Sequence, residues 1–438
     1  MIAAGAIFCG NLFAQTVLTP HFTDESKKIV IPKDAAVFPE IREGMIVVSR
    51  YPTLLYLNTK GEYIFGTDFA FTRGHDSKTA YFSGGAMMGW RTKPNGFAPS
   101  PFIVYPDGKY RDLAADISNA SSFLDGYALV HKGQSVIMGV KQTFIDKNGK
   151  EVFPALTSTQ RGTMGDMTIY PLREKRRLYY NADLKKYGYA DDKGVIAVKP
   201  QFDKGENFSE GLAAVMVNNK WGFIDPTGKM TIPATYNMKP GRFREGLAAV
   251  RIGDSEYNYE MAYIDKAGKR VMDNKRWSVN EFSNGLAWVG TGCEKLFVMN
   301  REFEEVRDLT QSFYYEGNGF GVCNFSMLSG DVQNRSWGFD FPNGRQVLSQ
   351  AGLDAAGEIF APDGSLLFTA RDAKGNRVGL HPITEGDLML VKVRFENEPR
   401  LKESNVYMSC FINQKGEVVY YFEEGVEGYE GRTPTQLK

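Results

Sequence analysis

One tryptophan lies close to one carboxylate at the start of a tight turn, in the segment KWGFIDPTGK that begins at Lys220. An exposed Trp221 could stack on a sugar ring, and Asp225 beside it could serve as the acid of a glycosidase. Such an enzyme needs a second carboxylate about 5–10 Å from the first across a substrate cleft. The chemistry therefore depends on whether the segment is unique and on which elements present its side chains.

The segment is not unique, because a strand, a turn and a glycine recur in the same order along the chain. Related segments are TFIDKNGK from Thr143, AYIDKAGK from Ala262 and CFINQKGE from Cys410. In full copies an aromatic residue, a Glu-Gly pair and an apolar run come first, as in FSEGLAAV from Phe208 and FREGLAAV from Phe243. About ten units of roughly 40 residues tile most of the chain.

Each half of a unit alternates with the two-residue period of a β-strand. Trp221 and Phe223 share one strand face and are expected in the core. Asp225 can accept a hydrogen bond from the backbone two residues on, and Gly228 can adopt the left-handed conformation that closes a hairpin. The structural signature of the repeat is Trp221, Gly222, Phe223, Asp225, Gly228, Gly211 and Gly246.

At these residues the chain resembles the WG-repeat (WG containing repeat) family of bacterial β-repeat proteins. The resemblance rests on KWGFIDPTGKMTIPATYN, on the F-x-EGLAAV segments that flank it, and on YGYADDKGVIAVKPQFDKGENF. It is specific from Lys186 to Val289 and fades on either side, and only Trp221 and Trp337 keep the Trp-Gly pair. The resemblance implies an exported or envelope-associated all-β protein, and it implies no catalytic residues.

We predict an all-β fold, a tandem array of small antiparallel β-meanders in a curved or superhelical stack over residues 38–422. A closed β-propeller is the alternative, although ten units exceed the usual four to eight blades. Residues 423–438 are expected to form a C-terminal tail.

Residues 1–14 read as the apolar part of a secretory signal, with a cut expected after Ala14. An apolar first strand is the alternative. Cys9 raises the possibility of a lipoprotein, but Phe8 before it is bulky. No later stretch has the roughly 20 apolar residues of a membrane-spanning helix. We expect a periplasmic, outer-surface or secreted protein.

Composition and residue spacing argue against several classes of protein and of site. Lys+Arg and Asp+Glu both count 52, so the chain lacks the basic excess of a general nucleic-acid binder. The four histidines and the aspartate turns lack the spacing of zinc or calcium sites, and we expect no metal or cofactor. The basic run REKRR from Arg173 is expected to be a solvated loop or a local contact for an anionic partner. The cysteines that follow the signal read as packing thiols, with one bridge possible among Cys293, Cys323 and Cys410.

The second residue after the Gly-Leu pair points to a binding residue, because its size varies widely between units. This position is occupied by Ala214, Ala249, Leu129, Val47, Met88 and Trp288. Either the position faces a groove or solvent, or its neighbours compensate for its size. We take Trp288 as the candidate for an exposed contact residue and Trp90 as a weaker one. The position before it is alanine in four units, which suggests that neighbouring units approach closely there.

The function expected from the sequence is that of an exported scaffold that binds a protein or a glycan and performs no catalysis. The alternative is an enzyme that acts on cell-surface polysaccharide, with its site in the irregular section 311–334, where the period breaks. A purely structural envelope spacer is a third possibility. The sequence does not identify the ligand.

Overall fold

A computed structural model describes residues 16–436. The gaps are at 34, 39–40, 51–52, 68–80, 92–99, 134–138, 162–167, 254–258, 275–276, 280, 283, 292–294, 309–337, 342–343, 349–357, 361–365, 377, 397, 402–405 and 427–434. Its regular structure is almost entirely β-strand, with two 3-10 turns, η2 (Pro154–Leu156) and η5 (Glu385–Asp387). No helix among these residues is long and apolar enough to cross a membrane. The prediction of an all-β fold built from small antiparallel sheets is confirmed.

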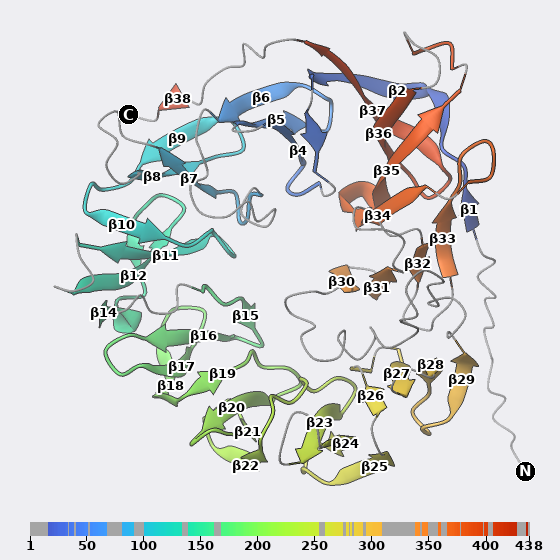
Figure 1. Cartoon of the computed structure of the whole chain (residues 1–438). Helices are drawn as coiled ribbons and strands as arrows, with labels where there is room; N and C mark the ends of the chain where they lie inside the picture. The colour runs from blue at the N-terminus through green and yellow to red at the C-terminus, as the bar shows by residue number, and fades with distance from the viewer. Residues whose placement is uncertain are drawn as a thin grey trace, which may run out of the picture.

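The described strands form nine sheets, which lie around a ring (Figure 1). Six sheets contain only strands that follow one another in the chain. They are β3 (Ala36–Val37), β4 (Met45–Arg50), β5 (Thr53–Asn58) and β6 (Tyr63–Thr67); β10 (Ile117–Ala120), β11 (Tyr127–Lys132), β12 (Val140–Asp146), β13 (Glu151–Val152) and β14 (Ser158–Gln160); β15 (Leu172–Arg173), β16 (Arg176–Asn181), β17 (Lys186–Ala190) and β18 (Ile196–Phe202); β19 (Lys204–Gly205), β20 (Ala213–Val217), β21 (Lys220–Ile224) and β22 (Met230–Tyr236); β23 (Leu247–Gly253), β24 (Tyr259–Asp265) and β25 (Arg270–Asn274); and β26 (Trp277–Val279), β27 (Ala287–Thr291), β28 (Lys295–Met299) and β29 (Glu305–Asp308).

The other three sheets each gain one strand from an end of the chain. They are β7 (Met87–Arg91), β8 (Ser100–Val104) and β9 (Lys109–Asp112) with β38 (Thr435–Gln436); β30 (Gly338–Phe341), β31 (Gly344–Leu348), β32 (Glu358–Phe360) and β33 (Leu366–Ala370) with β1 (Thr16–Leu18); and β34 (Gly379–Thr384), β35 (Leu388–Phe395), β36 (Val406–Ile412) and β37 (Glu417–Val426) with β2 (His21–Pro32). The added strands pair in parallel, whereas the other described pairs are antiparallel. Strands therefore reach beyond the expected limits at 38 and 422.

The ring closes where the first meander meets the last. One hydrophobic cluster joins Ile46 and Leu55 of the β3–β6 sheet to Leu390 and Phe411 of the β34–β37 sheet, with Ile29 of β2 among them. Of the two arrangements considered from the sequence, the structure has the closed one. Nine sheets rather than about ten units result because the segments that begin at 336 and 358 contribute two hairpins to a single sheet.

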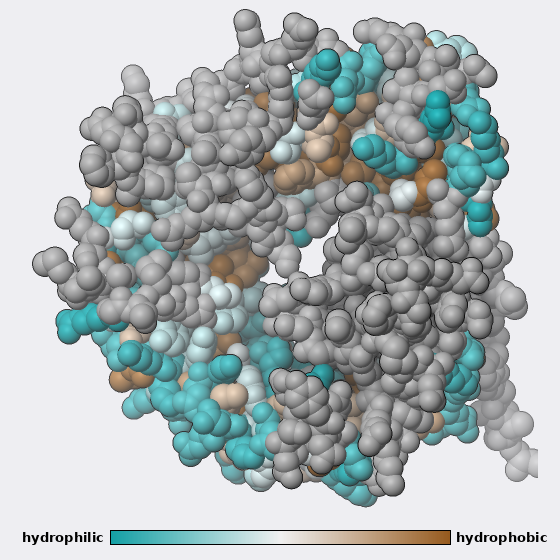
Figure 2. Space-filling model, viewed as in Figure 1, coloured by the Kyte–Doolittle hydropathy of each residue, from teal (hydrophilic) through white to brown (hydrophobic). Residues whose placement is uncertain are grey.

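A sheet that lies between two others can bury both faces, since alternate residues of a strand point to opposite sides. On β23, Ala248 and Val250 pack toward the β19–β22 sheet, and Leu247 and Ala249 pack toward the β26–β29 sheet. The alanines expected at close approaches do lie between sheets; they are Ala128, Ala213, Ala248 and Ala287. The ring is therefore held together by side chains between sheets, and Figure 2 shows that its middle stays open.

The Trp-Gly pair has a steric explanation. Trp221 is buried and packs between two sheets. A methyl group on Gly222 would lie 2.6 Å from the carbonyl oxygen of Ile232 and 2.8 Å from Cα of Ala234, so β22 crosses too close for any side chain there. Gly188 is in the same position under Val198 and Pro200. The glycine of the motif is required by the approach of the next strand.

Candidate functional site

The recurrent aspartates hold turns. Asp225 Oδ1 accepts hydrogen bonds from the backbone amides of Thr227 at 2.9 Å and Lys229 at 3.0 Å, and the Gly228 amide donates to the Asp225 carbonyl oxygen. A hydrogen bond from the Thr227 hydroxyl and those two amides lower the pKa of Asp225. A carboxyl held ionised by its own turn is poorly suited to donate a proton to a glycosidic oxygen. Asp146 and Asp265 make the same contacts.

The Glu-Gly pair forms a second turn, which the sequence analysis did not identify. Ser209 and Leu212 exchange both backbone hydrogen bonds, and Glu210 and Gly211 between them have φ of 54° and 84°. Positive φ at both central residues is the mark of a type I′ hairpin turn. The short strand before it, β19, adds an inner strand to the expected meander. The dipeptides Asp-Gly at 125 and Asn-Gly at 284 were the available signal.

In four of these turns the glutamate carboxylate binds the next turn around the ring. Glu43 accepts the amides of Gly84 and Gly85 at 2.6 and 3.0 Å. Glu174 accepts those of Glu210 and Gly211, Glu210 accepts those of Glu245 and Gly246, and Glu245 accepts that of Gly285. We call this series of contacts the turn relay. It explains why glutamate recurs in a conformation that non-glycine residues rarely adopt.

The expectation that REKRR is only a solvated loop or a local contact is wrong in part. Glu174 and Lys175 have φ of 49° and 61° and form the central pair of another such turn, with lysine in place of glycine. Arg177 is 4% exposed and donates to the Tyr170 carbonyl oxygen at 2.6 Å. Burial lowers the pKa of Arg177, and Asp125 beside it partly offsets this. The run belongs to a degenerate copy of the repeat.

The prediction that Trp288 is exposed is wrong, because only 4% of its surface is accessible. Ala214, Ala249, Leu129, Val47 and Met88 at the same register are buried too. At two described seams the position points at the adjacent sheet, with Ala214 facing the β23–β25 sheet and Ala249 facing the β26–β29 sheet. Trp90 is half-buried and packs against the cluster between the β7–β9 and β10–β14 sheets.

The histidines do not come together among the residues that the structure describes. His131 is buried in β11, and neither ring nitrogen has a hydrogen-bond partner there. Burial lowers the pKa of His131. Groups of three or more potential metal ligands are absent from the described part of the chain. Cys410 is a free, buried thiol, while Cys293 and Cys323 lie outside the described residues.

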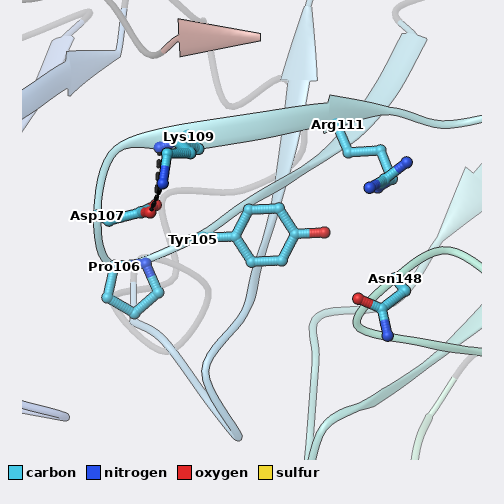
Figure 3. Close-up of a pocket in the computed structure, with 6 residues that line it drawn as sticks. All are labelled: Tyr105, Pro106, Asp107, Lys109, Arg111 and Asn148. Carbon is cyan, nitrogen blue, oxygen red and sulfur yellow. Dashed lines mark hydrogen bonds and ion pairs between the residues drawn. The ribbon is translucent and has the colours of Figure 1, made fainter. Parts of the chain in front are cut away.

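One hollow of about 430 Å³ opens at the seam between two sheets. We call it the Arg111 hollow, and it is lined by Tyr105, Pro106, Asp107, Lys109, Arg111 and Asn148. Figure 3 shows the guanidinium of Arg111 and the side-chain amide of Asn148 on the side toward which the Tyr105 hydroxyl points. Lys109 pairs with Asp107 at 2.6 Å, and the Tyr105 hydroxyl donates to the Lys147 carbonyl oxygen at 2.7 Å. The shielded Nε of Arg111 has no partner among the described residues.

The family comparison bears on the best-preserved units. Residues 187–221 and 221–255 match the family described as WG containing repeat. Residues 187–255 thus contain two adjacent WG repeats. The matched residues include the segments that carry the resemblance. They run from β17 through the whole β19–β22 sheet to β23. A search with the sequence finds no similar curated protein.

Solved structures similar to this protein share little sequence with it. BamB from Moraxella catarrhalis has 10% identity and a TM-score of 0.34, over 64% of this chain and 91% of that one. A eukaryotic initiation factor has 9% identity and a TM-score of 0.42, over 96% and 91%. KlHsv2 with loop 6CD replaced by a Gly-Ser linker has 10% identity and a TM-score of 0.30, over 87% and 98%.

Several sequence predictions fall outside the described residues. They concern the signal at 1–14, Trp337 and the irregular section 311–334, where the alternative enzyme site was placed. Within the described units, the predicted residues do not gather at one place. Trp221 and Asp225 are structural, and the Arg111 hollow contains none of the predicted binding residues.

Proposed function

We propose that this protein is an exported, non-catalytic scaffold that binds a protein or a glycan on its ring of WG units. The observation that carries the proposal is the use of the recurrent acids. The aspartates close their own turns and the glutamates bind the next turn, so the repeated carboxylates serve the architecture. Side chains that depart from this pattern are then available for a partner, as at the Arg111 hollow.

Export is part of the proposal and has its own test. The apolar residues before Gln15 support it, because they resemble a signal with a cut after Ala14. Expression in a bacterial host, followed by fractionation and N-terminal sequencing, should place a chain that begins at Gln15 outside the cytoplasm. An uncut chain that stays in the cytoplasm would contradict this part.

Binding is tested with the chain from Gln15 to its end on a glycan array and in pull-downs from envelope extracts. A heat-unfolded sample serves as the control for non-specific adsorption. We expect reproducible retention of one class of glycan or of one protein by the folded chain only. The same chain incubated with a panel of polysaccharides should release no reducing ends, and sustained release would show that the protein is an enzyme.

A further inference from the structure

The Arg111 hollow is where one WG unit departs twice from its relatives. In one kind of described turn the fourth residue, a glycine or Phe303, donates its amide to the carbonyl oxygen of the first residue. The first residue is Asp or Asn in eight of these turns; they begin at Asn58, Asp146, Asp191, Asp225, Asp265, Asn300, Asp372 and Asn413. The turn from Tyr105 to Gly108 begins with tyrosine instead. A carboxylate or amide that normally faces its own backbone is thus replaced by an aromatic side chain with a hydroxyl.

The second departure is Arg111, three residues after the turn glycine. The equivalent residues in the other units carry no charge; they are Ile64, Val152, Ala197, Thr231, Val271, Val306, Val378 and Val419. Both departures lie in the same unit and line the same hollow. The repeat needs neither Tyr105 nor Arg111, and the two occur together. This combination indicates a role other than building the ring.

The seam beneath the hollow is also altered. At other seams one apolar side chain of an outer strand lies on the turn glycine of the next sheet, as Val198 does on Gly228 and Ile232 on Gly268. At Gly149, Leu113 takes this place and the Cδ of Arg111 lies beside it, 3.9 Å from where a methyl group on the glycine would be. The stem of Arg111 is therefore supported by packing, while its guanidinium faces the hollow (Figure 3).

The charge of the lining limits the ligand. Arg111 and Lys109 each contribute +1 and Asp107 contributes −1, which leaves a net charge of +1. Lys109 is engaged with Asp107, so Arg111 is the cation left for an anion, and Asp107 would repel a second negative charge. A guanidinium binds a carboxylate through two parallel hydrogen bonds. A singly charged carboxylate suits this lining better than a phosphate dianion.

The uncharged groups around Arg111 favour a hydroxyl-rich ligand. The exposed amide of Asn148 can both donate and accept, and Asp107 and the Tyr105 hydroxyl add further polar atoms within the same lining. We infer that the Arg111 hollow binds an acidic sugar, a uronic-acid residue of a glycan, with its carboxylate on Arg111 and its hydroxyls toward Asn148.

This inference rests on the proposed binding function and narrows it to one site and one class of ligand. The probes are a galacturonic acid trisaccharide, its methyl ester as the neutral match, and a triglutamate peptide as a non-sugar carboxylate. Calorimetry and saturation-transfer NMR with the full chain from Gln15 should detect the acidic trisaccharide. Binding of the methyl ester should be at least about tenfold weaker, because the charged hydrogen bonds are lost.

The variants are Arg111→Gln, Asn148→Ala and, as a matched control, Arg307→Gln on the exposed outer strand β29. Arg111→Gln should weaken the acidic trisaccharide at least about tenfold with an unchanged melting temperature, since related units fold with uncharged residues there. Arg307→Gln should bind as the parent chain does. Asn148→Ala should weaken both the acid and its ester.

Three kinds of failure are distinguishable. If the chain binds a glycan or a protein on the array or in the pull-down and Arg111→Gln binds it equally well, the hollow is not the site and the scaffold function stands. If triglutamate binds as tightly as the trisaccharide, the assignment to a sugar is overturned. If no ligand of any kind is retained, the scaffold function itself fails.

Discussion

Removal of one carboxylate from the turn relay should destabilise the whole ring measurably. In Glu210→Ala, the amides of Glu245 and Gly246 lose their acceptor, and Lys266 loses its ion pair at 3.3 Å. A hydrogen bond to a charged group contributes about 1.5–3 kcal/mol. Glu210 is partly exposed, which favours the low end, and water can replace some of the lost acceptor. We expect a loss of about 2 kcal/mol in the free energy of unfolding.

Two further substitutions at this position separate the stabilisation by the carboxylate from the cost of the left-handed backbone conformation. Glu210→Gly loses the same contacts but relieves the left-handed conformation, which costs a non-glycine residue about 1–2 kcal/mol. It should therefore be less destabilised than Glu210→Ala. Glu210→Gln keeps one acceptor oxygen and should lose about 1 kcal/mol. Glu302→Ala, an exposed glutamate two residues into the Asn300 turn, is the control and should stay within about 0.5 kcal/mol of the parent.

The assay is urea unfolding followed by tryptophan fluorescence, at neutral pH and again at acid pH. Burial raises the pKa of Glu210, but hydrogen bonds from Gly246, Lys266 and Glu245 outweigh it and the pKa is lowered. The contribution of the carboxylate is therefore present above the unfolded pKa of about 4.3 and is lost as the pH falls through the folded pKa. The difference between the parent and Glu210→Gln should shrink accordingly. Two results would refute the relay as a stabilising device. One is a Glu210→Ala chain as stable as the Glu302→Ala control, and the other is a Glu210→Gly chain less stable than Glu210→Ala.

The remaining predictions concern other parts of the ring. Gly222→Ala should destabilise the fold by about 1–3 kcal/mol in urea unfolding, because the new methyl group meets the Ile232 carbonyl oxygen; an unchanged midpoint would contradict the steric reading of the Trp-Gly pair. Ile29→Ala should cost about 2–5 kcal/mol in the same assay, since this buried side chain lies where the ring closes, and a loss below 1 kcal/mol would argue against closure through β2. Cys410 should resist a thiol reagent until the chain unfolds, because it is buried and burial raises its pKa; peptide mapping after labelling would show whether it reacts in the native state. Burial lowers the pKa of His131, so the unfolded state binds the proton more readily and stability should fall as the pH drops below about 6.5; in His131→Met this part of the pH dependence should disappear, and an unaltered profile would refute it.

Local features of the unit could be predicted from the sequence because local chemistry determines them. The turn that starts at Asp225 needs only its own backbone and Gly228, and the alternation of Trp221 and Phe223 follows from strand geometry. Small residues such as Ala248 at a fixed register point to close packing whatever the neighbour is. These inferences transfer from one unit to another because they do not depend on what the unit packs against.

Features that depend on distant residues were missed. The role of Glu210 lies in amides about one unit away, and the burial of Trp288 does not follow from the residues of its own unit. Ring closure depends on β2 and β37, which meet across almost the whole chain. The Arg111 hollow had a visible signal, a tyrosine in place of Asp or Asn and an arginine in place of an uncharged residue. That signal can be recognised only when the units are aligned on their turn glycines.

The pairing of β2 with β37 has a consequence for how the protein is made. A ribosome releases β2 long before β37, so the early strand must wait for a partner that does not yet exist. Until then its backbone donors and acceptors are an unpaired edge, which invites association with other chains. Intermediate sheets can form in the meantime from local contacts. Synthesis of the last sheet is therefore the step that converts an open, association-prone chain into a finished ring.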